Sequence, residues 1–397
     1  MRPIILLLVA ALACGDDDAS DASTLDAAIP DVPNFDADNL DTGAADVLES
    51  DGGSSDGATA DVPLAQDAGR DVPPALPGVL YVNVGGSSRL AVVDVATDGS
   101  MVEREGERLE LPRSPGAMTF DAARRRFFVG GAMRVFTVEI DAAGAPTLGG
   151  MTTLPAQPVY LSLVGDTLIS AYFGADLLVS HDVSGAPPYR EIDSVDVPEE
   201  PHAARPIGRR LYVPHRNGAR VSWVNVAADG TFGELEGVDS DESVGPRHIA
   251  FHPSGAFAYI VNEFADTVSA YRVEAGALVP FGEATTTLPE GFDGDDNTGA
   301  DIHVHPSGDF LYTSNRGHDS IAILDIGADG QVSHRETVPT EARPREFELS
   351  AAGHLLFGLG QDTGAVQSYV VGADGSLTPS ERLVLGEDLR WGIFLSE

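Results

Sequence analysis

The sequence predicts an all-β fold, a single seven-bladed β-propeller of four-stranded antiparallel blades. Three observations support this fold class. From residue 78 onward, short apolar segments alternate with turn residues, and no 3.6-residue period persists. A unit of about 45 residues recurs seven times, a period typical of propellers and solenoids. Tight-turn residues recur at two places within the unit, so each unit is expected to fold as consecutive hairpins.

The clearest copies of the unit lie in the second half of the chain. They run over residues 250–262 and 303–315, and a weaker copy covers 348–360. The second strand of most units carries an aromatic residue, and the segment 167–172 fills the one gap in the series. The aligned aromatic residues are Tyr81, Phe128, Tyr212, Tyr259, Tyr312 and Phe357.

The turns and the chain ends complete the blade pattern. Pro-Ser-Gly at Pro253 and Pro306 is expected to join the first and second strands, and Ala-Asp-Gly at Ala228, Ala328 and Ala373 the third and fourth. The domain opens on a second strand at residues 79–84 and ends on an isolated strand at residues 390–395. The last strand is therefore expected to supply the missing inner strand and to close the ring.

The N-terminus predicts an exported lipoprotein. Residues 1–13 hold one cation, Arg2, and then an apolar run too short to span a bilayer, which is typical of a signal peptide. The only cysteine, Cys14, follows Ala-Leu-Ala at the position of a lipidated cysteine. Cleavage there without lipidation is the alternative. We expect lipid on Cys14 to tether the protein to the cell envelope, facing the periplasm or the cell surface.

Residues 14–77 predict a disordered acidic linker, followed by the propeller over 78–397. Residues 15–77 carry fifteen Asp and one Glu against a single Arg, a composition that buries too little apolar surface to fold. The whole chain has a net charge of −38 and no lysine. This acidity argues against a nucleic-acid partner and against adhesion to anionic lipid by charge alone.

Propeller topology places certain polar side chains on one face. The loop before each inner strand and the loop after each second strand open on the same face, opposite the Pro-Ser-Gly and Ala-Asp-Gly turns. The side chains expected at this mouth of the central channel are His202, Arg247, His248 and Asp301 before inner strands, and Arg216, Glu263, Arg316 and Gln361 after second strands. The turns on the other face hold only ordinary hairpin residues. A functional site is therefore expected at the mouth.

Several segments resemble the seven-bladed lactonase family, which includes propeller-type 6-phosphogluconolactonases and the fungal carboxymuconate lactonising enzyme. The resemblance is carried by Gly-Pro-Arg-His at 245–248 with Val-Asn-Glu at 261–263, and by segments 300–306, 312–317 and 343–347. It is close from about residue 200 onward, and only the repeat period supports it before that. The resemblance implies that His202, Arg247, Glu263 and Arg316 are the catalytic residues.

Those residue types suit lactone opening. Hydrolysis needs a base to activate water and cationic donors where oxyanion charge develops. Either Glu263 or His202 fits the role of base, and the sequence leaves both open. Arg247 and Arg316 would bind the carbonyl oxygen, or a carboxylate or phosphate of the substrate. His248, Asp301, Arg216 and Gln361 are expected to bind substrate.

The sequence thus favours a hydrolase that opens a sugar lactone or another small lactone, with neither cofactor nor metal. The fourth blade departs from the family at residues 206–208 and 212–216, which puts substrate identity in question. Export does the same, because phosphogluconolactone is a cytoplasmic metabolite. The alternatives are a non-catalytic binding propeller displayed on a stalk and a lactone-forming cycloisomerase. A monomer is the default expectation.

Overall fold

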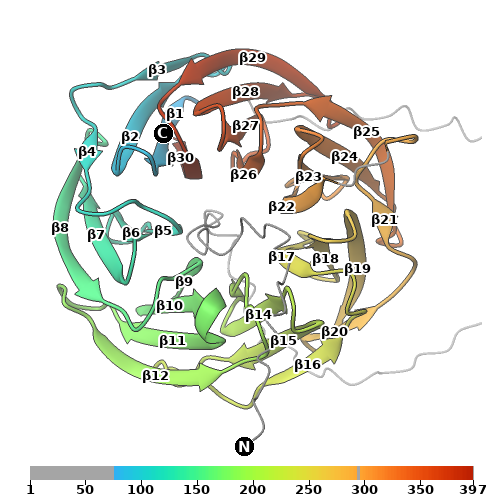
Figure 1. Ribbon diagram of the computed structural model, residues 1–397, viewed down its shortest axis with the longest axis horizontal. Coiled ribbons are helices and arrows are strands. Elements are labelled where there is room, and N and C mark those ends of the chain that lie inside the picture. Colours follow the sequence, from blue (N-terminus) through green and yellow to red (C-terminus); the bar gives the residue numbers. More distant parts are fainter. Residues whose placement is uncertain (1–75, 293–295, 397) are drawn as a thin grey trace, which may run out of the picture.

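Seven antiparallel sheets are arranged in a ring around a central axis in the computed structural model (Figure 1), which describes residues 76–292 and 296–396. The predicted seven-bladed propeller is therefore confirmed. The expected signal peptide, Cys14 and nearly all of the acidic linker lie outside the described residues. We number the blades 1–7 along the chain.

Each blade is an antiparallel meander, and its inner strand lies nearest the centre of the ring (Figure 1). The strands of blades 1–3 are β1 (Gly78–Val84), β2 (Arg89–Val95), β3 (Met101–Glu103), β4 (Leu109–Glu110) and β30 (Leu389–Ser396); β5 (Met118–Asp121), β6 (Arg126–Gly130), β7 (Arg134–Ile140) and β8 (Pro146–Thr153); β9 (Tyr160–Val164), β10 (Thr167–Tyr172), β11 (Leu177–Asp182) and β12 (Arg190–Asp196). A short 3-10 helix, η2 (Phe173–Ala175), follows β10.

The strands of blades 4–7 follow the same plan. They are β13 (Arg205–Ile207), β14 (Arg210–His215), β15 (Arg220–Asn225) and β16 (Glu236–Asp239); β17 (Pro246–Phe251), β18 (Phe257–Asn262), β19 (Thr267–Glu274), β20 (Ala277–Pro280) and β21 (Thr285–Thr286); β22 (Thr298–Val304), β23 (Phe310–Arg316), β24 (Ser320–Ile326) and β25 (Val332–Pro339); β26 (Pro344–Leu349), β27 (Leu355–Gly360), β28 (Ala365–Val371) and β29 (Leu377–Val384).

The C-terminal strand closes the ring, as the sequence predicts. β30 pairs antiparallel with β1 and forms the inner strand of blade 1. Two carboxylates of β26 fasten it to blade 7: Glu346 accepts a hydrogen bond from the N–H of Gly392 at 2.8 Å, and Glu348 accepts one from that of Phe394 at 3.0 Å. These bonds satisfy backbone donors on the side of β30 that does not pair with β1. Without them, these N–H groups would be buried without partners.

Repeated side-chain hydrogen bonds join neighbouring blades. In four blades, the tyrosine at the repeated aromatic position of the second strand donates its hydroxyl to a glycine carbonyl in the turn between the third and fourth strands of the next blade. The pairs are Tyr81 with Gly144, Tyr212 with Gly276, Tyr259 with Gly330 and Tyr312 with Gly375. His252 and His305, in the 1–2 turns, likewise donate to Gly308 and Gly353 of the next blade. The repeated aromatic residue is therefore an inter-blade fastener as well as a core residue.

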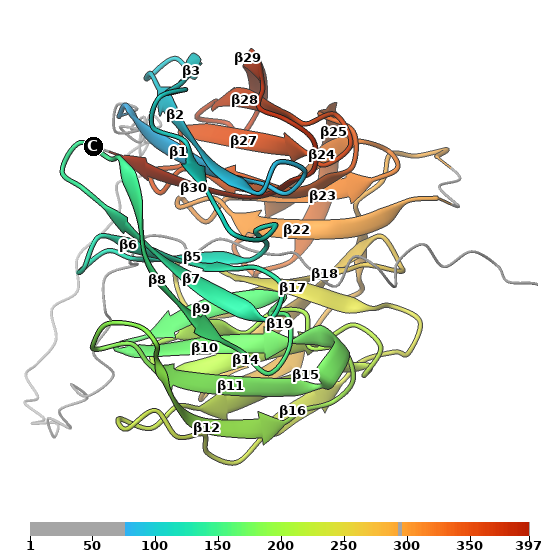
Figure 2. The same cartoon turned by 60° about the vertical axis from the view of Figure 1, so that its left-hand side comes forward.

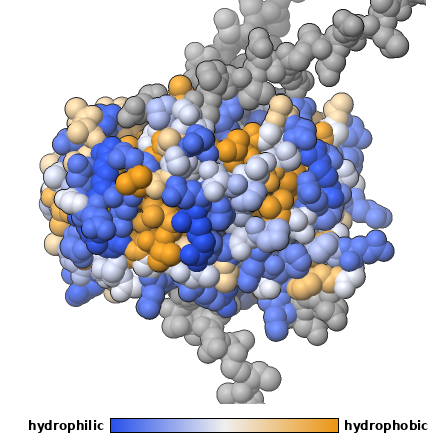
Figure 3. All heavy atoms as spheres, turned by 90° about the horizontal axis from the view of Figure 1, so that it is seen from above, coloured by the Kyte–Doolittle hydropathy of each residue, from blue (hydrophilic) through white to orange (hydrophobic). Residues whose placement is uncertain are grey.

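Blades pack face to face around the ring, as seen in the turned view of β5–β8 beside β9–β12 (Figure 2). The second strands and most inner strands are almost wholly buried, whereas the outer strands are mostly exposed or half-buried. The side of the ring is mostly hydrophilic, with only small apolar patches (Figure 3). None of the helices in the described part of the chain is long and apolar enough to cross a membrane.

Candidate active site at the channel mouth

β-Bulges shape the start of the inner strands at the mouth. The register shifts between Pro246 and His248 in β17, and between Pro344 and Glu346 in β26. Similar shifts occur in β22 and β30. A bulge re-aims the extra residue and bends the strand. At this level of the ring, the strand pairing aligns His202 of blade 4, Arg247 of blade 5, Ala300 of blade 6, Arg345 of blade 7 and Arg390 of blade 1.

Glu263 lies among three arginines from three blades. Its Oε1 is 2.8 Å from the Nη2 of Arg316 and 3.2 Å from the Nη1 of Arg216. Its Oε2 is 3.0 Å from the Nε of Arg247. Arg247 is fully buried, and Glu263 and Arg316 are 2% and 5% exposed. Residues 216, 247, 263 and 316, which the sequence assigned to the mouth, thus form one ion-paired cluster.

The charges of this cluster are strongly coupled. Burial raises the pKa of Glu263, but the fields of Arg316, Arg247 and Arg216 outweigh it and hold that pKa well below its usual range. Glu263 is therefore an ionised carboxylate and a weak base near neutral pH. Burial, followed by repulsion from Arg316, lowers the pKa of Arg247. Since arginine remains protonated in proteins, Arg247 is a buried cation, and it shares the carboxylate of Glu263 with Arg216 and Arg316.

Two buried donors of the cluster, Nη2 of Arg247 and Nε of Arg316, have no hydrogen-bond partner among the described residues. The Nε of Arg247 and the Oε2 of Glu263 are close enough to attract each other but lack the alignment of a hydrogen bond. Buried polar groups are normally satisfied, so these atoms mark a place prepared for polar atoms of a ligand.

Arg216 is fixed more completely than the other two arginines. Its Nε donates to Glu200 at 2.9 Å while its Nη1 reaches Glu263. The guanidinium carbon lies 4.6 Å from the ring centre of Phe173 and 5.4 Å from that of Phe264. Two carboxylates and two aromatic rings thus hold this side chain, so its main effect is to position Glu263.

His202 lies at the same level as Arg247, within the channel wall. It is 3% exposed, and its ring packs edge-on against Phe173 and His248, with centroids 5.5 Å and 5.3 Å away. Burial, then repulsion from Arg247, lowers its pKa well below the usual value. The imidazole is therefore neutral near pH 7. Its Nδ1 is buried and has no hydrogen-bond partner in the described part of the chain.

His248 and Asp301 directly follow Arg247 and Ala300 in their inner strands, and His303 lies two residues after Asp301. The Nδ1 of His248 donates to one carboxylate oxygen of Asp301 at 3.0 Å, and the Nε2 of His303 donates to the other at 3.0 Å. Asp301 and His248 are fully buried. Burial raises the pKa of Asp301, but both histidines lower it far more. Asp301 therefore fixes the tautomer and orientation of His248, which in turn packs against His202 and Arg247.

Gln361 belongs to a separate group at the mouth. Its amide donates to Asp388 at 3.2 Å, and Asp388 also accepts from the Nε of Arg390 at 2.6 Å. This group joins blades 7 and 1, whereas the Glu263 cluster joins blades 4, 5 and 6. Within residues 76–292 and 296–396, no three His, Cys, Asp or Glu side chains are grouped so as to hold a metal ion.

Sequence reasoning missed two contributors to the mouth, Glu200 and Phe173, and placed Arg345 there only as part of the segment 343–346 before an inner strand. Glu200 and Phe173 lie in irregular segments outside the repeat, so the pattern gave no signal for them. Arg345 had a signal, because Pro344-Arg345 repeats Pro246-Arg247. The strand pairing places both arginines at the same level of the ring.

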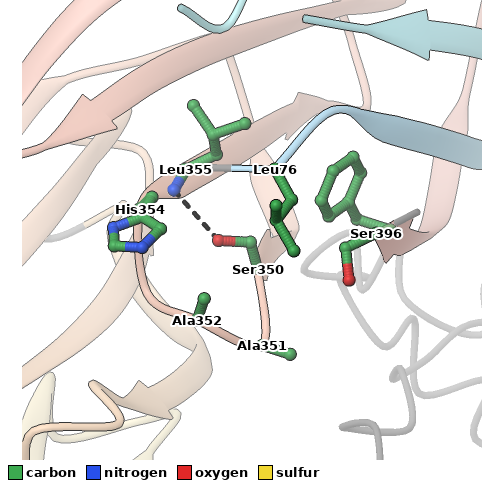
Figure 4. A pocket seen from close by; sticks show the side chains of 8 residues that line it. Leu76, Ser350, Ala351, Ala352, His354, Leu355 and Ser396 are labelled. Atoms are coloured by element: carbon green, nitrogen blue, oxygen red, sulfur yellow. Dashed lines mark hydrogen bonds between the residues drawn. The ribbon is translucent and has the colours of Figure 1, made fainter. Parts of the chain in front are cut away.

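A shallow pocket opens on the opposite face, beside the 1–2 turn of blade 7 (Figure 4). Leu76, Leu355 and Phe394 form its apolar walls, and His354 lies at its edge. The hydroxyl of Ser350 is engaged there, since it accepts a hydrogen bond from the N–H of Leu355 at 3.0 Å. This pocket lies on the other face of the ring from the Glu263 cluster, and its walls are mostly apolar.

Comparisons with known proteins show the family of the chain. The family model for "Lactonase, 7-bladed beta-propeller" matches residues 81–389. The 6-phosphogluconolactonases of Serratia proteamaculans and Pectobacterium carotovorum are each 30% identical to this chain. Those alignments cover 80% and 79% of the chain, and 99% and 97% of the two relatives.

Solved structures show the same fold at lower identity. The periplasmic gluconolactonase of Pseudomonas aeruginosa superposes with a TM-score of 0.71 at 21% identity, covering 81% of this chain and 99% of that one. A putative 6-phosphogluconolactonase from Bacteroides fragilis gives 0.72 at 20%, covering 84% and 100%. The matching family model and the full-length relatives establish that the chain belongs to the seven-bladed β-propeller lactonase family, a family of lactone-hydrolysing enzymes.

Proposed function

We propose that the chain opens a sugar lactone at the channel mouth, with His202 as general base and Arg247 and Arg316 as oxyanion-binding residues. The observation that carries this assignment is the set of buried, unpartnered polar atoms on these three side chains. Arg247 and Arg316 belong to a cluster in which three guanidinium groups share the carboxylate of Glu263. A lactone carbonyl that becomes an oxyanion would supply the missing acceptor.

The proposed reaction consumes one water molecule. Neutral His202 accepts a proton as the water oxygen bonds to the carbonyl carbon, and Arg247 and Arg316 stabilise the resulting oxyanion. When the intermediate collapses, the bond from the carbonyl carbon to the ring oxygen breaks. The imidazolium then returns its proton to the leaving alkoxide, which gives the open hydroxy acid.

Glu263 fits a positioning role better than the role of base. Its pKa is lowered by the surrounding arginines, so it accepts a proton poorly near neutral pH. Its Oε1 lies within 3.2 Å of the guanidinium groups of Arg216 and Arg316, and its Oε2 lies 3.0 Å from the Nε of Arg247. We therefore assign the choice between Glu263 and His202, which the sequence left open, to His202.

The names of the relatives suggest two substrates, gluconolactone and its 6-phosphate. Both are six-carbon sugar lactones and differ in one phosphate group. The purified chain should be assayed with this pair, with spontaneous opening in buffer subtracted. Turnover of either lactone supports the proposed function, whereas a rate equal to the spontaneous one for both contradicts it.

We also propose that the protein is exported and tethered to the cell envelope by lipid on Cys14. The support is in the sequence: a short apolar leader, a single cysteine directly after Ala-Leu-Ala, and an acidic segment long enough to act as a spacer. A single acyl chain binds membranes only weakly, so stable anchoring requires the multiple chains that bacterial lipoproteins carry.

A further inference from the structure

The repeat places an arginine of blade 7 in the same structural position as Arg247. In β17 the register shifts after Pro246, and in β26 it shifts after Pro344. Each proline pairs with the last residue of the second strand, Asn262 and Gly360 respectively. Arg345 and Arg247 are therefore equivalent bulged residues at the same level of the channel.

Arg345 faces the channel and not an outer blade surface. It is 6% exposed, although it lies at the loop end of its strand. Its charge acts on His202 of blade 4 and on Arg247 and Glu263 of blade 5. Blade 7 lies across the ring from blade 4 (Figure 1), and the strand position that Arg345 shares with Arg247 places it at the channel mouth.

The other positions at this level carry no further unshared charge. Continuing the strand register aligns Gly116 of blade 2, Val159 of blade 3 and Ala300 of blade 6 with Arg345. Blade 1 supplies Arg390, which Asp388 neutralises at 2.6 Å. Blades 2, 3 and 6 thus carry uncharged residues at this level, whereas blade 7 carries an arginine.

Like charges are held close together here at a cost. Arg316 and Arg345 both lower the pKa of Arg247, against the attraction of Glu263. Arg247 and Arg316 share the carboxylate of Glu263 with Arg216, and buried cations without full compensation are destabilising unless a partner binds. Guanidinium groups bind carboxylate and phosphate in a fork geometry. The unpartnered Nη2 of Arg247 and Nε of Arg316 show that this cluster still has donors to offer.

We propose that Arg345 is a further substrate-binding residue, which takes an anionic group, carboxylate or phosphate, on the part of the substrate remote from the lactone carbonyl. The proposal rests on the proposed function, since it assigns the carbonyl to Arg247 and Arg316 and the remote group to Arg345. It makes Arg345 the residue that discriminates charged from neutral lactones.

The test compares Arg345→Ala with a matched control, Arg343→Ala. Arg343 lies two residues earlier, is exposed, and contacts Asp362 at 3.8 Å. With gluconolactone 6-phosphate, Arg345→Ala should raise KM about ten- to a hundredfold, the value of a charge-assisted hydrogen bond, while kcat changes little. The KM of Arg345→Ala for gluconolactone should equal that of wild type. In Arg343→Ala, KM and kcat for both lactones should equal those of wild type. Arg345→Lys should recover part of the loss, because it restores the charge without the fork.

Binding measurements separate this proposal from the proposed function. Calorimetric titration with the open acids, gluconate 6-phosphate, glucarate and gluconate, requires no turnover. If wild type turns over neither lactone, the proposed function fails, yet weaker binding of the phosphate or dicarboxylate by Arg345→Ala alone still supports Arg345. The two anions show whether phosphate or carboxylate is preferred. Equal affinity of wild type and Arg345→Ala for both anions, with unchanged melting temperature, overturns the proposal.

Discussion

The Nη2 of Arg316 lies 2.8 Å from the Oε1 of Glu263, and this contact joins blade 6 to blade 5 at the channel mouth. The two residues follow equivalent second strands, β23 and β18, so the same position in neighbouring blades carries opposite charges. Arg216 occupies that position in blade 4 and contacts the same carboxylate. Three consecutive blades thus meet in one ion-paired cluster.

Glu263→Gln should destabilise the fold and reduce turnover without changing the shape of the pH–rate profile. It leaves Arg216, Arg247 and Arg316 without their shared counter-charge, and loss of one partner of a buried ion pair costs about 3–5 kcal/mol. Thermal unfolding and kcat/KM across pH check this. Glu200→Gln, which removes only a more exposed partner of Arg216, is the control and should have a smaller effect. Loss of the acid limb in Glu263→Gln would instead identify Glu263 as the base.

Arg247→Ala and Arg316→Ala should each lower kcat for lactone opening about 10²–10³-fold, the usual cost of losing one oxyanion donor. Lysine at either position should not restore the rate, because it lacks the planar fork. Steady-state kinetics with either sugar lactone measures this. Arg220→Ala, which removes an exposed ion pair with Asp239 at the start of β15, should leave the rate unchanged. Full activity in both mouth variants would exclude the assigned oxyanion role.

Stability should fall as pH is lowered from 6.5 toward 3, in part through His215. Burial lowers the pKa of this histidine to about 3, whereas its unfolded value is about 6.5. In that window the unfolded chain binds a proton that the folded chain does not, so the free energy of unfolding decreases with falling pH, by about 1.4 kcal/mol per pH unit for one such group. His215→Gln should flatten the dependence of the unfolding free energy on pH. The control is His252→Gln, in a turn on the opposite face. If the unfolding free energy of His215→Gln depends on pH as steeply as that of wild type and of His252→Gln, the assignment to His215 is wrong.

Cys14→Ser should move the full-length protein from the membrane fraction to the soluble fraction. The physical reason is that the acidic chain has no charge-based affinity for anionic lipid, so acyl chains on Cys14 would be its attachment. Fractionation with detection of the propeller measures this, and Ser20→Ala in the same segment is the control. Unchanged partitioning of Cys14→Ser would remove the lipoprotein assignment.

The repeat and the closure of the ring were predictable because each depends on local pattern. The turn triplets, the aromatic positions and the missing inner strand at residue 78 all follow from hydrophobic period and turn chemistry. Topology then assigned Arg216, Arg247, Glu263 and Arg316 to one face, and the structure brings them within hydrogen-bonding distance.

The features of the site that could not be predicted from the sequence depend on β-bulges and on contacts between blades. A bulge changes the register by one residue, so the sequence shows that Pro344-Arg345 repeats Pro246-Arg247, but only the strand pairing shows that both arginines are bulged residues at one level of the ring. Asp301 was expected to bind substrate, yet its carboxylate is directed at His248 and His303. Alternation along a strand says which face a residue occupies, but not which neighbour it contacts.

The most direct measurement is kcat/KM for sugar-lactone opening as a function of pH, in wild type and in His202→Asn. The account predicts opening faster than the spontaneous rate. Because burial and the nearby arginines lower the pKa of His202, the base stays neutral and active to well below pH 6.5, and the acid limb should lie there. His202→Asn should lower the rate about 10²–10⁴-fold, whereas His305→Asn on the opposite face should not. Absence of lactone opening in wild type, or full activity in His202→Asn, would contradict the account.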